Sequence, residues 1–411
     1  MRIIFFTFSF LFALGLWAQD PDFVRAEAEV LSDSTFHGRG YVKDGSRKAA
    51  EYIARRFSDF DVLPVGDDFF QSFSFRVNTF ETPSTLIVDG KKLNEGHDYI
   101  ADPRSGASTG RYPIITLDST HFQPGGKVPK TKGKLPVINL KGIDTPDEVT
   151  ALHNLKLAVL PVGPMVLLQP DKLTWSVGEM NYPNAVFEVL RAAFPENAKE
   201  VEMDLQPREI DFEAVNVVGK IEGRRSDSCV VITAHYDHLG RMGEALFAGA
   251  SDNGSGVAVM LDLARHYDGS KPKFDTWFIA FAGEEAGLKG SKFFVDNPLF
   301  PLGKIKLLIN LDLMGSAANG ITVVNGRLYP ELMEKMAAIN TKSELLPKIK
   351  LRGKAANSDH YWFSEAGVPA IFIYTEGNIT AYHDVNDIAS GLDWTNYAEV
   401  FTLLTEFIKT L

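Results

Sequence analysis

Five short motifs contain the side chains best suited to bind metal ions or move protons. They are His235-Tyr236-Asp237-His238, Gly249–Gly256, Glu284-Glu285, Asp312 and His383. Each follows an apolar run that predicts a β-strand, or lies in the loop after such a run. In open α/β sheets, ligands bind outside the carboxyl ends of the strands. We therefore expect these motifs to meet at one site.

The first motif pairs an imidazole with a carboxylate at the end of the apolar run Cys229–Ala234. Residues i and i+2 of a strand share a face, so His235 and Asp237 are expected to point the same way. A carboxylate next to a metal-binding histidine orients its ring and raises its basicity. We predict that His235 is a metal ligand, that Asp237 is its partner, and that His238 points elsewhere. Taken alone, the pair also fits a hydrogen-bonded strand end.

The second motif, Gly249–Gly256, is a glycine-rich turn that opens a predicted helix at 255–267. Glycines permit tight backbone conformations and close approach to an ion. Asp252 has two carboxylate oxygens and can bridge two metals, although a helix-capping aspartate is the simpler alternative. The turn lacks the Lys-Ser/Thr ending of a phosphate-binding loop.

Two adjacent carboxylates, Glu284 and Glu285, follow the predicted strand Trp277–Phe281. Neighbouring side chains at a strand end point in different directions, so one can bind a metal while the other faces a water molecule. We predict that Glu285 is a ligand and Glu284 the general base. The alternative is a solvated acidic start of a helix, which the helix dipole favours.

The last two motifs are Asp312 and His383. Asp312 ends the apolar run Leu307–Leu311, where a carboxylate is costly unless it is paired or bound to a cation. His383 lies in a loop after the predicted strand Ala370–Tyr374. Together the motifs supply nitrogen and oxygen ligands typical of zinc, without thiolates. The single cysteine, Cys229, is predicted to be a buried apolar side chain.

The elements that must position these residues alternate between strands and helices from about residue 206 onward. This alternation predicts an α/β fold with a mostly parallel, doubly wound mixed sheet flanked by helices. Predicted strands are Val215–Ile221, Cys229–Ala234, Trp277–Phe281, Leu307–Leu311, Ile321–Val324 and Ala370–Tyr374, and predicted helices are 255–267, 288–296, 330–340 and 394–409.

The two segments before residue 206 have different patterns. Residues 22–59 have apolar positions at helical spacing, so we expect N-terminal helices within 19–70 that pack on the catalytic domain. Residues 71–205 contain short β-type runs, including Ser84–Val88, Pro113–Leu117 and Leu157–Leu160. This β-rich insert contains no candidate ligand or base, so we predict that it shapes substrate access. The α/β domain that carries the motifs would then occupy 206–411.

Composition limits the partners and the compartment. A net charge of −11 argues against a nucleic-acid partner, because phosphate binding needs a basic face. Residues 1–18 combine a short basic start with an apolar run too short to span a bilayer comfortably, which predicts a cleaved signal peptide. We expect a periplasmic or extracellular protein without a stable membrane anchor.

The order and context of the motifs resemble the di-zinc aminopeptidase family, whose superfamily also includes glutamate carboxypeptidase, transferrin receptor and glutaminyl cyclase. The insert resembles, more loosely, a protease-associated domain. The stretches that carry the resemblance are Ala234–Asp237, Gly249–Gly256, Phe281–Gly287, Asn310–Gly315, Ser358–His360 and Tyr382-His383.

The resemblance implies two zinc ions per chain and a role for each motif residue. One zinc would be bound by His235 and Asp312, the other by Glu285 and His383, with Asp252 bridging. Glu284 would act as general base on a water shared by the ions, Asp359 would lie just outside the ligand shell, and Tyr382 is a candidate oxyanion donor or an ordinary packed tyrosine. The stretch Asp384–Ile388 departs from the family pattern, which leaves the shape of that loop open.

The implied activity is removal of N-terminal residues from peptides with a free amino end. Glutaminyl cyclase on the same scaffold with one zinc, and carboxypeptidase-type specificity, remain alternatives. A non-enzymatic receptor would be expected to have lost ligands, and none is missing here. The sequence indicates neither the preferred first residue nor the oligomeric state.

Overall fold

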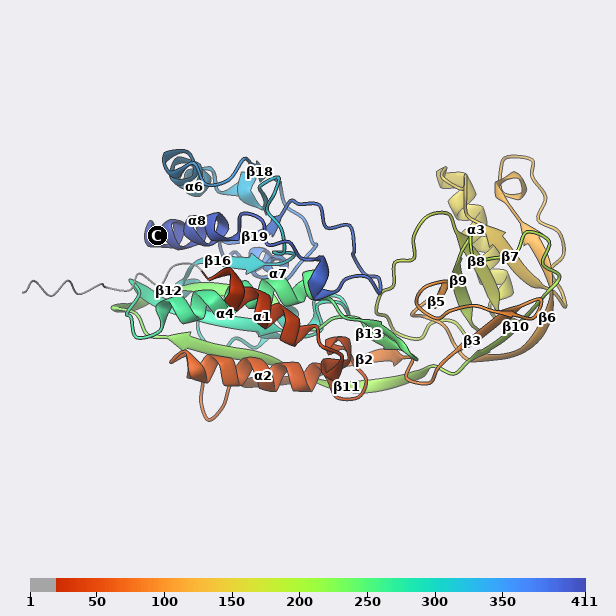
Figure 1. Cartoon of the computed structure of the whole chain (residues 1–411), viewed down its shortest axis with the longest axis horizontal. Helices are drawn as coiled ribbons and strands as arrows, with labels where there is room; N and C mark the ends of the chain where they lie inside the picture. Colours follow the sequence, from red (N-terminus) through yellow and green to blue (C-terminus); the bar gives the residue numbers. More distant parts are fainter. Residues whose placement is uncertain (1–19) are drawn as a thin grey trace, which may run out of the picture.

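The computed structural model describes residues 20–411, so the predicted signal peptide at 1–18 lies outside the described residues. The chain forms two parts (Figure 1): a large sheet flanked by helices, and a β-rich insert that lies at the opposite end of the molecule from α6 and α8. Within residues 20–411, no helix is both long enough and apolar enough to cross a membrane.

The large sheet has nine strands, and its centre is parallel. Strand β12 (Arg225–His235) pairs in parallel with β15 (Phe274–Phe281) on one side and with β16 (Ile305–Leu311) on the other. The remaining strands are β19 (Ala370–Thr375), β17 (Ile321–Val324), β18 (Ile349–Leu351), β11 (Arg208–Ile221), β1 (Leu63–Pro64) and β2 (Phe70–Thr79). Both β17 on β19 and β11 on β15 are antiparallel, which makes the sheet mixed as predicted.

Alternation along the strands divides the core between the two faces of this sheet. In β12, Val230 and Ile232 belong to the larger core, while Cys229 and Val231 belong to the core on the opposite face. The larger core is covered by α1 (Pro21–Leu31), α2 (Gly45–Asp59), α4 (Gly256–Tyr267), α6 (Pro330–Ser343) and α8 (Tyr397–Lys409). The opposite face is covered by α5 (Lys289–Asp296) and α7 (His360–Glu365). The predicted α/β sandwich is confirmed.

The N-terminal helices have clear local causes. Asp20 caps α1 by accepting hydrogen bonds from the backbone N–H groups of Asp22 and Phe23, and Pro21 occupies the first helical turn. The buried sides of both helices, including Leu31 and Phe57, join the larger core. This packing places residues 34–41, which connect the two helices, against the loops at the carboxyl end of the sheet.

The insert has its own eight-stranded sheet, and four of its strands run parallel: β6 (Ser108–Leu117), β7 (Leu135–Asn139), β8 (Met165–Gln169) and β9 (Val186–Leu190). The others are β3 (Thr85–Val88), β4 (Lys91–Lys92), β5 (Tyr99–Ala101) and β10 (Glu200–Leu205). Strands β2 and β11 enter and leave the insert as an antiparallel pair that belongs to the nine-stranded sheet. The core of the insert also includes Met242 and Phe247, which come from the hairpin β13 (Gly240–Met242) and β14 (Ala245–Phe247).

One predicted strand is wrong. The run Leu157–Leu160 is the last turn and cap of α3 (Pro146–Val159), not a β-strand. The helix starts at a capping box in which Thr145 and Glu148 satisfy each other's backbone N–H groups, with Pro146 at the first helical position. The capping box begins at Thr145, nearly the whole length of the helix before the apolar run at Leu157. The four apolar residues alone therefore could not distinguish a helix from a strand.

Candidate functional site

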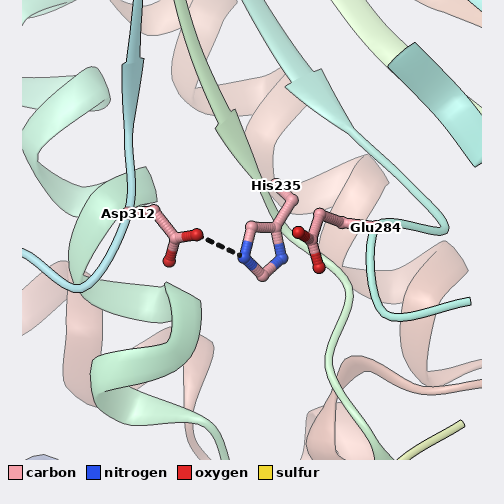
Figure 2. Close-up of side chains that lie close together, drawn as sticks. All are labelled: His235, Glu284 and Asp312. Atoms are coloured by element: carbon pink, nitrogen blue, oxygen red, sulfur yellow. Dashed lines mark ion pairs between the residues drawn. The ribbon is translucent and has the colours of Figure 1, made fainter. Parts of the chain in front are cut away.

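Three of the predicted site residues meet where neighbouring strands end. His235 is the last residue of β12, Glu284 follows β15, and Asp312 follows β16. The His235 ring lies between the two carboxylates (Figure 2), and its Nε2 is 3.4 Å from Asp312 Oδ2. One ligand atom from each of these three side chains lies within 4.8 Å of the others. The arrangement follows from the parallel pairing, which brings the carboxyl ends of the strands to one edge.

Asp252 connects this group to a second one. Its Oδ1 is 3.3 Å from Nε2 of His235, and its Oδ2 is 3.0 Å from Nε2 of His383. Nε2 of His383 is also 3.2 Å from Oε2 of Glu285. The Asp252 carboxylate therefore lies between two sets of nitrogen and oxygen atoms, which is how a carboxylate that bridges two ions must lie. All five residues predicted as ligands are brought together.

Asp237 holds the loop that carries the two glutamates. Its carboxylate accepts hydrogen bonds from the backbone N–H groups of Glu284 (3.1 Å) and Glu285 (3.3 Å), and from the hydroxyl of Tyr41 (2.7 Å). The ring of His235 contacts the backbone carbonyl of Asp237 through Nδ1 at 3.2 Å, while the Asp237 carboxylate is 3.9 Å from that nitrogen. The structure thus places the carboxylate closer to the glutamate loop than to the histidine.

The expectation that His238 points elsewhere is wrong. Its Nδ1 lies 2.8 Å from Glu285 Oε1, and the ring belongs to a possible metal group with Asp252 and Glu285. Strand β12 ends at His235, so the alternation of side chains that holds within a strand no longer applies three residues later. His238 is fully buried, and its Nε2 has no hydrogen-bond partner within residues 20–411.

The Asp252 loop is held by two residues that the sequence analysis did not assign to the site. The fully buried Arg39 donates to the carbonyl oxygens of Leu31, Tyr236, Ala248 and Gly249 at 2.6–2.8 Å. Asp387 accepts from the backbone N–H groups of Ser251 (2.7 Å) and Asp252 (3.0 Å).

Nothing in the local sequence of either residue marks this role. Arg39 lies in the stretch His37–Gly40, which by itself indicates only a turn. Asp387 lies in Asp384–Ile388, the stretch that departs from the family pattern.

Glycine is required at position 249. Gly249 has φ of +62°, and a Cβ there would lie 2.3 Å from the carbonyl oxygen of Asp252 and 2.4 Å from the His238 ring. The tight turn therefore brings Asp252 and His238 together.

His383 is held from the insert. Its Nδ1 contacts the backbone carbonyl of Trp175 at 3.0 Å, and the Trp175 N–H donates to the His383 carbonyl at 2.9 Å. Lys172 donates to the carbonyls of Thr380 (3.1 Å) and Tyr382 (2.9 Å), and its Nζ lies 2.7 Å from Asp384 Oδ2. The insert contributes no predicted ligand, yet it positions the loop that carries one.

Tyr382 stacks on the neighbouring ligand ring. Its ring centroid is 4.0 Å from that of His383, with an interplanar angle of 13°. The side chain remains 45% exposed and lines the cavity above the metal-ligand cluster. This position is open to a substrate, and it also supports the imidazole through packing.

Two more buried groups surround Asp312. The Ser358 hydroxyl donates to Asp312 Oδ2 at 3.1 Å and accepts from Nδ2 of Asn310 at 2.8 Å. Asp359, the next residue, is fully buried, and burial raises the pKa of its carboxyl to about 7. Burial, together with Glu285 and other nearby carboxylates, also raises the pKa of Glu284 well above its usual value.

The residues present fit a pair of divalent cations. Asp252, Glu284, Glu285 and Asp312 form a buried or nearly buried cluster, and packing so many carboxylates away from water is costly without compensating positive charge. Oδ1 of Asp312 is buried without a hydrogen-bond partner within the described residues, so it is available to a cation. Imidazole and carboxylate ligands without thiolates are a donor set that suits zinc.

Comparison with known proteins indicates the family of the segment that carries these residues. The profile of peptidase family M28 matches residues 216–408. Over 215 residues the chain is 28% identical to a probable leucine aminopeptidase of Trichophyton verrucosum, covering 49% of this chain and 56% of that protein. Over 186 residues it is 31% identical to aminopeptidase YwaD of Bacillus subtilis, covering 42% of this chain and 39% of that protein. The matched segment therefore spans about half the length of these relatives, or less.

Solved structures share the fold over nearly the whole chain. A zinc aminopeptidase from Bacillus subtilis has a TM-score of 0.69 at 20% identity, covering 95% of this chain and 94% of its own. An aminopeptidase from Aneurinibacillus sp. strain AM-1 has a TM-score of 0.65 at 20% identity, covering 95% and 92%. The predicted family is confirmed at the level of the segment that carries the site: residues 216–408 match the profile of peptidase family M28.

Proposed function

We propose that this protein is a zinc-dependent aminopeptidase that removes N-terminal residues from peptides with a free amino end. The observation that carries the proposal is the position of Asp252, whose two carboxylate oxygens lie within 3.3 Å of His235 on one side and of His383 on the other. This arrangement favours a site for two ions over the one-zinc glutaminyl cyclase alternative. The match to peptidase family M28 supports the class of reaction.

In this proposal, His235 and Asp312 would hold one zinc and Glu285 and His383 the other, with Asp252 between the two sets of ligands. Zinc bound there would supply Lewis-acid chemistry. The carboxylate of Glu284 would accept a proton from the attacking water and pass it to the leaving amine. The cluster of carboxylates attracts the α-ammonium group of the substrate. Tyr382, at the mouth of the cavity, is placed to donate a hydrogen bond to the developing oxyanion.

Metal analysis and a substrate panel test the proposal. Protein purified without chelator should contain two zinc ions per chain, whereas a content of one that added zinc does not change would favour the cyclase. The panel compares aminoacyl anilides, their N-acetylated forms, γ-glutamyl substrates and peptides with N-terminal glutamine, each with and without chelator. We expect hydrolysis of the free aminoacyl substrates alone, lost with chelator and restored by zinc. Equal hydrolysis of the N-acetylated forms would contradict an aminopeptidase.

We also propose that the chain is exported by residues 1–18 and acts in the periplasm or outside the cell. The short basic start and the apolar run that follows it in the sequence support this. Fractionation of producing cells, with N-terminal sequencing of the recovered protein, tests it. We expect a chain that starts after Ala18, and intact Met1 on a cytoplasmic chain would contradict export.

A further inference from the structure

A cavity of about 230 Å³ opens next to the metal-ligand cluster. Part of its lining is the cluster itself, with His235, Asp252, Glu284, Asp312 and His383, and Leu313 and Tyr382 adjoin the last two of these. The rest of the lining is formed by Arg352, Asn357, Phe372 and Tyr374. Binding sites for drug-sized ligands usually measure about 300–1,000 Å³, so this cavity suits a single side chain next to the cluster.

Arg352 is the one lysine or arginine among the described residues that line this cavity. It directly follows β18, and its backbone N–H donates to the carbonyl of Val323 at 2.9 Å, which anchors the residue at the sheet edge. Its side chain donates from Nη1 to the Tyr374 hydroxyl at 3.1 Å. No carboxylate within residues 20–411 forms an ion pair with it. A guanidinium group has five N–H donors, so most of its capacity is available to a ligand.

Part of the cavity lining is aromatic. Phe372 and Tyr374 are two residues apart on β19, so they share a face of the strand, and their ring centroids are 5.4 Å apart. The Tyr374 hydroxyl receives the hydrogen bond from Arg352, which places the guanidinium beside this aromatic surface. The cavity lining thus combines carboxylates and imidazoles, an aromatic surface, and an arginine bonded to that surface.

We propose that Arg352 selects substrates that carry a carboxylate, foremost peptides whose first residue is Asp or Glu. This rests on the proposed aminopeptidase function. An acidic first residue presents its α-ammonium group to the cluster, its methylene groups to the aromatic surface and its carboxylate to Arg352. Arginine recognises carboxylates well because its planar fork matches their geometry. The α-carboxylate of a dipeptide is a second source of the same group.

The test compares matched neutral and acidic substrates on the zinc-loaded protein. The first arm measures kcat/KM for the p-nitroanilides of Glu and Gln, which differ in charge but hardly in shape. We expect Glu to exceed Gln by about 10- to 100-fold, the range for a hydrogen bond to a charged group. The second arm compares Ala-Ala with Ala-Ala amide, which isolates the α-carboxylate. A preference for Glu over Gln in the first arm means that Arg352 binds the side-chain carboxylate of the first residue. A preference for Ala-Ala over its amide in the second arm alone means that Arg352 binds the C-terminal carboxylate.

Variants connect the preference to this residue. Arg352→Met and Arg352→Gln should each reduce the Glu/Gln ratio to near one, and Arg352→Glu should favour the Lys anilide over the Glu anilide. Arg327→Met is the matched control: Arg327 is exposed, its backbone N–H bonds to the Arg352 carbonyl, and it does not line the cavity. Zinc content and Tm are measured for each variant, so that misfolding is recognised.

Calorimetric binding of L-glutamate and L-glutamine to the zinc-loaded protein measures the same preference without turnover. In the unmodified protein, three ratios near one would overturn the inference: Glu to Gln in kinetics, Ala-Ala to Ala-Ala amide in kinetics, and glutamate to glutamine in binding. Hydrolysis of the Leu anilide would then still support the proposed aminopeptidase function. If no aminoacyl substrate is hydrolysed but glutamate still binds better and the difference depends on Arg352, then the proposed function fails and the inference stands.

Discussion

The sheet edge and the loop that carries His383 hold their predicted metal ligands in different ways. At the sheet edge, His235 ends β12 while Glu285 and Asp312 follow β15 and β16, and their partners lie within the same half of the chain. His383 instead bonds to Trp175, 208 residues earlier and in the insert. The proposed site is therefore complete only when the insert is docked, although the insert supplies no ligand.

This difference predicts separable defects. Substitutions that remove contacts at the sheet edge should destabilise the core of the catalytic half, because those contacts are buried and connect several loops at once. Removing the Lys172 contacts should affect a single predicted ligand, because the Lys172 ammonium group contacts the loop around His383. Three experiments compare the two regions, in order of decreasing expected effect.

The largest effect is expected within the sheet edge itself, at Glu284 and Glu285. Glu284→Gln removes the proton acceptor but leaves the five predicted ligands, so turnover should fall by roughly 10²–10⁴-fold while zinc content is retained. Glu285→Gln weakens a ligand, so zinc content should fall together with activity. Zinc analysis and steady-state kinetics on both variants check this. Loss of metal from the Glu284 variant, with retention in the Glu285 variant, would reverse the two assignments.

A smaller but still large effect is expected at Arg39. Arg39→Met leaves the carbonyls of Leu31, Tyr236, Ala248 and Gly249 without their buried donor. Leaving buried polar groups unsatisfied costs about 1–3 kcal/mol each, so the free energy of unfolding should fall by about 3 kcal/mol or more. Urea unfolding of the metal-free protein measures it. Arg55→Met, at an exposed position on α2, is the control. An equal fall in its free energy of unfolding would show that the buried Arg39 hydrogen bonds do not cause the loss of stability.

The smallest effect is expected at Lys172. Lys172→Met removes its contacts to Thr380, Tyr382 and Asp384 but leaves the sheet edge intact. Because Nζ is partly exposed, we expect the affinity for one of the two zinc ions to fall by about 3- to 10-fold, with little change in the free energy of unfolding. Titration with a competing chelator resolves the two ions. The control is Lys141→Met, at an exposed position in the insert.

The result at Lys172 decides whether the comparison holds. Unchanged affinity for both ions would mean that the insert does not position His383 in solution. An equal loss of affinity for both ions would mean that the His383 loop and the sheet edge form one structural unit rather than two.

The parts of the fold that were predictable have strong local signals. The buried strand Cys229–Ala234 and the helix at 255–267 were predicted to within a few residues, because long apolar runs and helical periodicity depend on near neighbours. The insert was harder. The apolar stretch Leu157–Leu160 fits a strand or a helix equally well, and the capping box that decides the matter begins at Thr145.

The candidate site shows the same limit. Residues that follow predicted strands could be assigned to one edge, since parallel strands end together. The contacts of Tyr41 and Arg39 could not be predicted from the sequence, because a hydrogen bond between residues about 200 positions apart leaves no periodic pattern in either segment. The position of His238 could not be predicted either, because the chain leaves the regular strand before it reaches that residue.

The sequence by itself determined the strand and helix order of the catalytic half, the types of the ligands, and the edge at which they meet. These depend on burial patterns and on where each apolar run ends. Only the tertiary structure decided that the insert holds His383, that Arg39 joins the loops around Asp252, and that Arg352 lines the same cavity as the predicted metal ligands. Each of these depends on how separately folded segments dock, and docking is determined by the shapes of packed surfaces that no local pattern encodes.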